Sequence, residues 1–153
     1  MSPRLLFVKK PSQPNRDRFA ASGHARCLTA CMTFERQRLG ERGETIACDA
    51  LEKLGYRIIQ RRYRSRFGEI DVVANEGDTV VFVEVKTKTD GSFSDPIESV
   101  TLQKQRRLVS MAEEYAACCG LDDTACRFDV VGVDLSVMPP RITLYKDAFR
   151  PGW

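Results

Sequence analysis

The chain has 153 residues, the usual length of one domain, and its net charge of +3 gives no strong bias in the choice of partner. With 42% hydrophobic and 29% charged residues it has the composition of a globular protein, so fibrous and acidic-tail classes are excluded. The single histidine, His24, disfavours catalytic triads, zinc proteases and zinc deaminases. The longest apolar run, Val80–Val83, is too short to span a bilayer, so we expect no membrane partner.

The start of the chain is basic and differs in composition from the rest. Residues 1–43 carry nine basic and three acidic side chains, and three prolines interrupt the first part without apolar periodicity. We therefore predict a disordered N-terminal extension over 1–34 and one domain over 35–153, with Met32 as an alternative start. An Arg-rich, acid-poor segment is also typical of an organellar transit peptide, which stays a minor alternative.

Six cysteines occur, but no secretory signal accompanies them, because Leu5–Val8 is too short for the apolar core of a signal peptide. We expect the cysteines to be small buried hydrophobes in a reducing compartment, and we therefore predict a cytoplasmic protein. His24, Cys27 and Cys31 could supply three zinc ligands, although their spacing is not that of a zinc knuckle and no fourth ligand lies nearby.

Hydrophobic spacing and turn residues predict the order α-β-β-β-α-β-β. The first helix, about Phe34–Leu54, has apolar residues at steps of three and four in its second half and ends at Gly55. The other predicted elements are strands at Tyr56–Gln60, Glu69–Ala74 and Thr79–Lys86, a polar loop at 88–96, a helix at about Val100–Cys119, and strands at Phe128–Val133 and Ile142–Tyr145. This order predicts a mixed β-sheet flanked by helices, an α/β sandwich.

Arginines gather around one aromatic residue in and after the first predicted strand: Arg57, Arg61, Arg62, Tyr63, Arg64 and Arg66. A basic cluster with an aromatic residue inside it attracts a phosphate backbone, so it is a candidate nucleic-acid surface. The alternative is a solvated strand-and-loop surface without a ligand.

The second and third predicted strands form a hairpin with several charges on one face. We predict its turn at 75–78 with Ala74 paired to Thr79, which places Asp71 opposite Phe82 and diagonal to Glu84. In this register, Glu69 lies opposite Glu84. Strand alternation then gathers the following side chains on one patch: Glu69, Asp71, Glu84 and Lys86.

Asp71 and Glu84 are the candidate metal ligands of this patch. Two carboxylates that share a site repel each other, and a divalent cation relieves that repulsion. Oxygen ligands without Cys or His suit Mg²⁺ or Mn²⁺ better than zinc. A metal held there could bind a scissile phosphate, while Lys86 could orient or deprotonate a water or stabilise the transition state. The alternative is a salt bridge from Lys86 to Glu84 or to Asp71.

Each predicted helix adds one ionisable residue near its start on the face that meets the sheet. Glu44 lies three residues before Ala47, and Lys104 lies four residues before Leu108. A glutamate favoured by the helix dipole and a lysine extended over apolar surface are the alternatives. The coincidence of both residues with the hairpin carboxylates favours a site.

Residues 68–71 (GEID) and 82–86 (FVEVK) resemble the signature of the bacterial YraN-like proteins, which belong to the PD-(D/E)xK nuclease superfamily and are similar to archaeal Holliday-junction resolvases. The resemblance extends from about Arg38 to Val133 and includes further matches at Gly43-Glu44, Leu54-Gly55-Tyr56, Pro96, Lys104 and Arg127–Val131. The first 31 residues have no counterpart in it, and the last strand is only weakly matched.

The resemblance implies a restriction-endonuclease-like core in which Mg²⁺ (or Mn²⁺) is bound by Asp71, Glu84 and the Val85 carbonyl. It implies that Lys86 is the catalytic lysine, that Glu44 approaches the metal as in junction resolvases, and that Lys104 supports the phosphates. Glu69 would be an outer group of the site or a partner for an arginine. Family members carry an arginine after the EVK, where this chain has Thr87-Lys88-Thr89, so Lys88 would make that phosphate contact instead.

The implied function is a Mg²⁺-dependent endonuclease that hydrolyses DNA phosphodiester bonds, with branched DNA among the candidate substrates. A non-catalytic module that binds nucleic acid or a protein is the second hypothesis, and a structural domain with a salt-bridge network is the third. DNA is the partner we favour. A homodimer is an open option, because symmetric nicks in a junction need two sites, but no dimer face is evident from the sequence.

Overall fold

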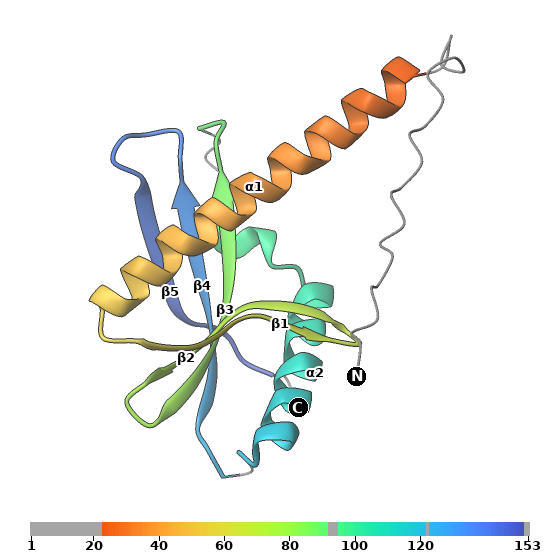
Figure 1. Cartoon of the computed structure of the whole chain (residues 1–153). Coiled ribbons are helices and arrows are strands. Elements are labelled where there is room, and N and C mark those ends of the chain that lie inside the picture. The colour runs from red at the N-terminus through yellow and green to blue at the C-terminus, as the bar shows by residue number, and fades with distance from the viewer. Residues whose placement is uncertain (1–22, 92–94, 122, 152–153) are drawn as a thin grey trace, which may run out of the picture. The chain divides into compact units, whose positions relative to one another are not determined.

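The computed structural model describes residues 23–91, 95–121 and 123–151, with side chains from Met32 onward (Figure 1). A division falls between Glu35 and Arg36, inside the first helix, and the fold below is that of the residues from Arg36 on. The elements are α1 (Gly23–Lys53), β1 (Arg57–Ser65), β2 (Gly68–Glu76), β3 (Thr79–Lys88), the short 3₁₀ helix η1 (Pro96–Ser99), α2 (Leu102–Cys119), β4 (Cys126–Asp134) and β5 (Arg141–Phe149). The predicted order and α/β class are confirmed.

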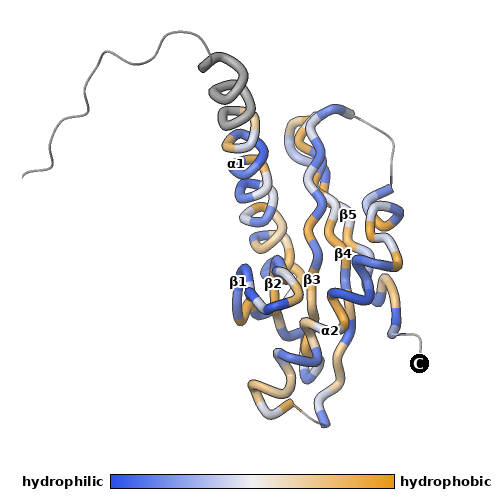
Figure 2. The backbone as a smooth tube through the Cα atoms, turned by 90° about the vertical axis from the view of Figure 1, so that its right-hand side faces the viewer, coloured by the Kyte–Doolittle hydropathy of each residue, from blue (hydrophilic) through white to orange (hydrophobic). Residues whose placement is uncertain are grey.

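The five strands form one mixed sheet in the order β1-β2-β3-β4-β5. Strands β3 and β4 are parallel and α2 connects them, whereas the other neighbours are antiparallel. Figure 2 shows α1 and α2 on opposite sides of this sheet. Within the part of the chain that the structure describes, neither helix is long and apolar enough to cross a membrane.

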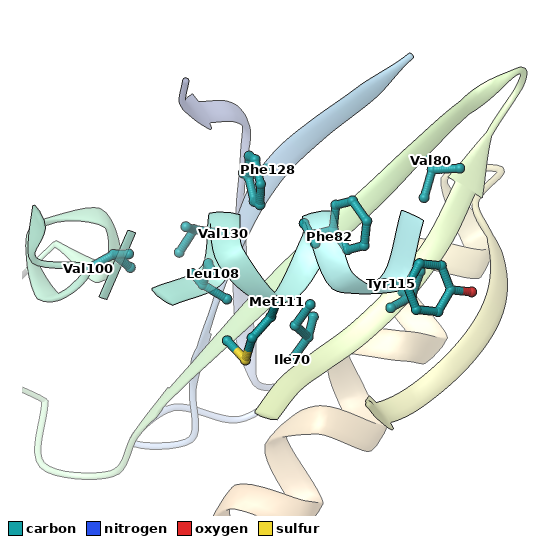
Figure 3. Close-up of a cluster of buried hydrophobic side chains, with 11 residues drawn as sticks. Ile70, Val80, Phe82, Val100, Leu108, Met111, Tyr115, Phe128 and Val130 are labelled. Atoms are coloured by element: carbon teal, nitrogen blue, oxygen red, sulfur yellow. The ribbon is translucent and has the colours of Figure 1, made fainter. Parts of the chain in front are cut away.

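Each face of the sheet packs against one helix. On the α2 face, Leu108, Met111 and Tyr115 pack among Ile70 and Phe82, as Figure 3 shows. On the α1 face, a second cluster contains Ala47, Cys48, Leu51, Val81 and Val83. Both clusters bury apolar surface at about 25 cal/mol per Å², which fixes the two helices on the sheet.

Helix α1 begins at Gly23, well before the predicted Phe34. That prediction followed apolar periodicity, whereas Ala25, Arg26, Leu28 and Ala30 are good helix formers and no proline interrupts them. Of the disordered extension predicted over 1–34, residues 1–22 lie outside the described residues, whereas residues 23–34 lie in α1. The side chains of the zinc ligands considered, His24, Cys27 and Cys31, are also outside what the structure describes.

The cysteine prediction is only partly confirmed. Cys48 is free and buried, but Cys118, Cys119 and Cys126 are free and exposed. Cys118 and Cys119 end α2 beyond the last buried residue of its stripe, Tyr115, so the sheet no longer covers them.

Two predictions about the first three strands are wrong. Strand β1 continues to Ser65 rather than ending at Gln60, because its arginine-rich half pairs with β2 from Arg61↔Val72 to Ser65↔Gly68. The β2–β3 turn contains only Gly77 and Asp78, with Gly77 at φ 58°, so that Glu76 pairs with Thr79. The true register is therefore shifted by two residues, and an even shift preserves the predicted faces where the strands pair, from Val72 to Glu76.

The remaining boundaries differ by a few residues. Helix α2 begins at Leu102 instead of Val100, because the Thr101 side chain caps it by accepting from the Lys104 N–H at 3.3 Å. Strands β3, β4 and β5 are longer than predicted because backbone pairing extends beyond their apolar centres. The predicted loop at 88–96 includes residues 92–94, which lie outside the described residues; Lys88 still belongs to β3, and Pro96 begins η1, which the sequence did not indicate.

Gly43 permits the close crossing of α1 over β3. A Cβ atom at Gly43 would collide with the Thr87 side chain, whereas a Cβ at Gly40, also in α1, would meet nothing within 4 Å. We expect Gly40→Ala to raise the free energy of unfolding by about 0.5–1 kcal/mol, because alanine favours helix. We expect Gly43→Ala to lower it by about 1–3 kcal/mol, because overpacking moves the helix. Urea denaturation of both variants checks this, and equal effects would contradict it.

Candidate active site where β2 leaves β3

The site begins where the β2–β3 ladder ends. Val72↔Val83 is the last pair of the ladder, so Asp71 and Glu84 are the next residues on the two strands. There the Asp71 side chain replaces a backbone partner, since its Oδ2 accepts the Val85 N–H at 2.7 Å. Ile70 packs in the α2-face cluster and Val72 in the α1-face cluster, so the alternation of β2 breaks at Asp71. The separation of the strands therefore brings the Asp71 carboxylate to the end of β3.

Glu84 is the buried centre of the site, with only 4% of its surface exposed. Lys86 Nζ donates to Glu84 Oε1 at 2.8 Å, and Lys104 Nζ lies 3.2 Å from Oε2. The Oε2 atom is nevertheless buried without a hydrogen bond, because the Lys104 contact lacks hydrogen-bond geometry. Lys104 thus faces the sheet as predicted, and the Lys86–Glu84 ion pair considered as an alternative is present.

The surroundings of Asp71 in this site disfavour its charged form. Burial and the negative charges of Glu84 and Glu44 raise the pKa of Asp71 to about 7, against the opposing effects of the Val85 N–H and Lys104. Because Glu44 acts on this pKa, the α1 glutamate shares the electrostatic field of the hairpin carboxylates. The charged form of Asp71 therefore lacks a sufficient counter-charge in this structure.

Glu44 is buried, as its place in the helix stripe predicted, but an arginine of β1 holds it. Arg62 Nε and Nη2 donate to the two Glu44 oxygens at 2.7 and 3.1 Å, and Arg62 Nη1 reaches Glu41 at 3.1 Å. Arg62 takes a left-handed conformation with φ 53°, which costs a non-glycine residue energy. This bidentate pair fixes the Glu44 carboxylate and raises the pKa of Arg62.

The donor set fits a hard divalent cation. Among the residues that the structure describes, no group of three or more His, Cys, Asp or Glu side chains could hold a metal. The Asp71 carboxylate, whose pKa is raised, and the buried Glu84 Oε2, which accepts no hydrogen bond, remain. Mg²⁺ commonly takes one or two carboxylates and completes its shell with water or phosphate. Asp71 and Glu84 therefore suit Mg²⁺ or Mn²⁺, and the role of the Val85 carbonyl stays a prediction.

Glu69 does not lie opposite Glu84, contrary to the predicted register. It pairs instead with Arg64, whose Nε donates to Glu69 Oε2 at 2.8 Å, across the β1–β2 ladder. This agrees with the alternative that Glu69 is a partner for an arginine, and it reduces the predicted carboxylate patch to two members.

Six of the predicted nucleic-acid residues lie on strand β1 and the turn after it, at one edge of the sheet, and Lys88 lies at the end of β3. Their side chains diverge: Arg61 contacts Thr45 on α1, Arg66 lies 3.6 Å from Glu114 on α2, and Tyr63 packs edge-on against Tyr115. Arg64 and Arg66 have 80% exposed side chains, so they remain accessible to a ligand. The role of the full set stays a prediction: Arg57, Arg61, Arg62, Tyr63, Arg64, Arg66 and Lys88.

Replacing Asp71 tests the electrostatics of the site. Because the pKa of Asp71 is raised from 3.8 in the folded state, its contribution to stability is complete below pH 4 and is lost as the pH rises through about 7. We expect Asp71→Asn to stabilise the protein by about 1–3 kcal/mol at pH 8 and to change little at pH 4. Thermal denaturation at the two pH values measures this. The exposed Asp49→Asn is the control, and an equal gain at both pH values would contradict the assignment.

A family model matches the region that contains this site. The family described as "Uncharacterised protein family UPF0102" matches residues 43–133. The chain belongs to this family. UPF0102 proteins lie in the restriction-endonuclease-like superfamily, so the resemblance found in the sequence is confirmed. The match includes the five residues whose side chains are proposed to bind the metal or to act in catalysis: Glu44, Asp71, Glu84, Lys86 and Lys104.

Other proteins of this family align with the chain over most of their own length. A UPF0102 protein of Syntrophus aciditrophicus is 46% identical over 113 residues, which cover 74% of this chain and 89% of the relative. One of Dehalococcoides mccartyi is 43% identical over 117 residues, covering 76% of this chain and 97% of the relative. One of Symbiobacterium thermophilum is 49% identical over 98 residues, covering 64% and 83%.

Sequence reasoning missed the Arg62–Glu44 pair. Arg62 was grouped with its neighbours as a candidate phosphate contact, and no local pattern distinguishes it from them. The pairing depends on the left-handed backbone of β1 at Arg62 and on the crossing of α1, which are tertiary features.

Proposed function

We propose that this UPF0102 protein is a Mg²⁺-dependent endonuclease that hydrolyses phosphodiester bonds of DNA. One observation carries the proposal: Asp71 and Glu84 adjoin at the point where β2 leaves β3, and two lysines from different elements bracket Glu84. Coupled carboxylates beside lysines are the parts that metal-assisted phosphate hydrolysis needs.

Asp71 and Glu84 would hold the metal, which, when bound, supplies a Lewis acid that lowers the pKa of a water and neutralises phosphate charge. The overall reaction is balanced by water alone: its oxygen forms a bond to phosphorus, the bond from phosphorus to one sugar oxygen breaks, and that oxygen takes a proton. The products are a phosphate monoester and a free hydroxyl group.

The chain's own residues position the reactants. Lys86 Nζ, held on Glu84 Oε1 at 2.8 Å and 33% exposed, is placed to donate to a phosphate oxygen or to orient the attacking water. Lys104 brings a second positive charge to the other Glu84 oxygen from the start of α2. Glu44, fixed by Arg62, adds negative charge on the α1 side and strengthens the preference for a cation.

DNA would be held by charge rather than by base recognition. The exposed Arg64 and Arg66 lie at the β1 edge, and Lys88 follows Lys86 on β3. Contacts of this kind bind the phosphate backbone, and their affinity falls steeply with salt. Two symmetric cuts in a branched substrate would require a homodimer.

A non-catalytic binding module is the second candidate, and one observation favours it. The Glu84 charge is already compensated by Lys86 and Lys104 without a metal. Such a module would bind DNA through the arginines of β1 but would need no divalent cation at Asp71.

A cleavage assay separates the two candidates. The substrates are a four-way junction, a flap, a duplex, single-stranded DNA and a structured RNA, each with Mg²⁺, Mn²⁺, Ca²⁺ or EDTA. We expect cutting of DNA with Mg²⁺ or Mn²⁺ and none with EDTA. Lys86→Ala should lose this activity, whereas Glu69→Gln, whose carboxylate pairs with Arg64, should retain it. Binding without cutting under every condition would favour the module and overturn the nuclease.

A further inference from the structure

A pocket adjoins the candidate site at the ends of β3 and β4. Its volume is about 360 Å³, near the lower end of the roughly 300–1,000 Å³ of small-molecule pockets. Its lining comes from β3, β4, β5 and the segment around η1: Lys86, Thr87, Lys88, Asp95, Pro96, Ser99, Gly132, Val133, Asp134, Arg141, Thr143 and Tyr145. Lys86 thus belongs both to this pocket and to the Glu84 site.

Two tertiary contacts shape the pocket. A Cβ atom at Gly132 would collide with Pro96, so only glycine lets η1 lie against β4 at this depth. Asp95 caps η1 by accepting the Ile97 N–H at 3.1 Å and also accepts from the Tyr145 hydroxyl, which raises the pKa of Tyr145. These contacts hold Tyr145 and the start of η1 together at the pocket before any ligand enters.

The lining combines the chemistry of both parts of a nucleotide. Three cations (Lys86, Lys88 and Arg141) and two carboxylates (Asp95 and Asp134) give it an excess of positive charge. Asp134 lies 3.8 Å from Lys88, and hydrogen bonds from Ser136, with smaller effects of the Lys88 and Arg141 charges, lower its pKa. Positive charge suits a phosphate.

Uncharged groups provide the rest of a nucleotide site. Thr87, Ser99 and Thr143 supply hydroxyl groups that can donate or accept hydrogen bonds. Pro96 and Tyr145 supply apolar and aromatic surface for a base.

We infer that this pocket receives one unpaired nucleotide of the DNA strand, adjacent to the phosphate beside Lys86. The inference rests on the proposed function and narrows its substrate class to DNA that carries an unstacked nucleotide at the cut, as at a bulge, a flap or a branch point. A base pair within a regular duplex does not enter the pocket, because its base is stacked and paired.

A binding experiment without cleavage tests this. A fluorescent 2-aminopurine is placed as a single-nucleotide bulge in one duplex and as a paired base in a second duplex of the same length. Both are titrated with the full chain in Ca²⁺. Binding is measured by anisotropy of an end label, and the surroundings of the base by 2-aminopurine fluorescence. Free dAMP is a further probe, because it separates a site for a nucleotide from a site that needs the strand.

Two tryptophan substitutions on neighbouring residues of β5 provide the matched pair. Thr143→Trp fills the pocket, whereas Ile142→Trp changes a residue that is 40% exposed and does not line it. We expect the wild-type chain to bind the bulged duplex roughly tenfold more tightly than the paired one, in the range that one stacked base contributes. Thr143→Trp should remove that difference and the 2-aminopurine response, and Ile142→Trp should keep both.

The outcomes separate the two proposals. Equal affinity for the two duplexes in the wild-type chain, or a Thr143→Trp variant that keeps the preference, overturns the pocket inference and leaves the nuclease standing. Loss of the preference in both tryptophan variants also overturns it, because the effect would then not depend on the pocket. Binding of dAMP without any preference for the bulge overturns the strand-bound nucleotide in favour of a free one. No binding of any DNA overturns the proposed function itself.

Discussion

Replacing Glu84 by glutamine should reduce metal-dependent DNA cleavage by about a thousandfold or more, because this carboxylate is proposed to bind the metal and it also holds Lys86 in place. Glutamine keeps the shape of the side chain, so the core around Phe82 and Val83 should remain packed. Cleavage rates of the best substrate at saturating Mg²⁺ measure the effect.

A second measurement, the melting temperature with and without Mg²⁺, distinguishes loss of metal binding from loss of catalysis. Mg²⁺ should raise the melting temperature of the wild-type chain by binding only to its folded state, and Glu84→Gln should abolish that rise. Lys86→Ala should lose cleavage but keep a Mg²⁺-dependent rise, because Asp71 and Glu84 remain. If Glu84→Gln cuts at the wild-type rate, the assignment of Glu84 is wrong. If Lys86→Ala loses the rise as well, Lys86 acts through the structure of the site and not in the chemistry.

The second large effect concerns a buried polar network that sequence reasoning did not find. Asp129 is 1% exposed and accepts from Arg127 through both oxygens, from the Tyr56 hydroxyl at 2.9 Å, and from the Asp147 N–H at 2.9 Å. Burial and the Asp129 contact raise the pKa of Tyr56. The network joins the end of α1, β4 and β5, and it satisfies a carboxylate that would otherwise be costly to bury.

We expect Asp129→Ala to lower the free energy of unfolding by about 3–5 kcal/mol, because it leaves the Arg127 charge partly buried without its main partner. Tyr56→Phe should cost about 1–3 kcal/mol, since it removes two hydrogen bonds to charged groups, one donated to Asp129 and one accepted from Arg127. Urea denaturation measures both, and the exposed Asp123→Ala should change little. A loss below 1 kcal/mol for Asp129→Ala would show that the network contributes little to stability.

The sequence alone determined the class of the fold and which residues are candidates for the site. Apolar runs in β3 and β4 and the stripes of α1 and α2 depend on local spacing, so the order of elements followed from them. Asp71, Glu84 and Lys86 stood out because charges are unusual in such apolar strands. Glu44 and Lys104 stood out because they interrupt the helix stripes, and the structure places both beside the carboxylates.

Only the tertiary structure decided which charges meet. The two-residue turn at Gly77-Asp78 shifted the register and excluded Glu69, since turn geometry depends on backbone angles that composition does not specify. The Arg62–Glu44 pair, the Asp129 network and the pocket beside Lys86 join residues that lie far apart in the chain. Local patterns carry no information about such pairs, because the contacts form only when the helices and strands pack together.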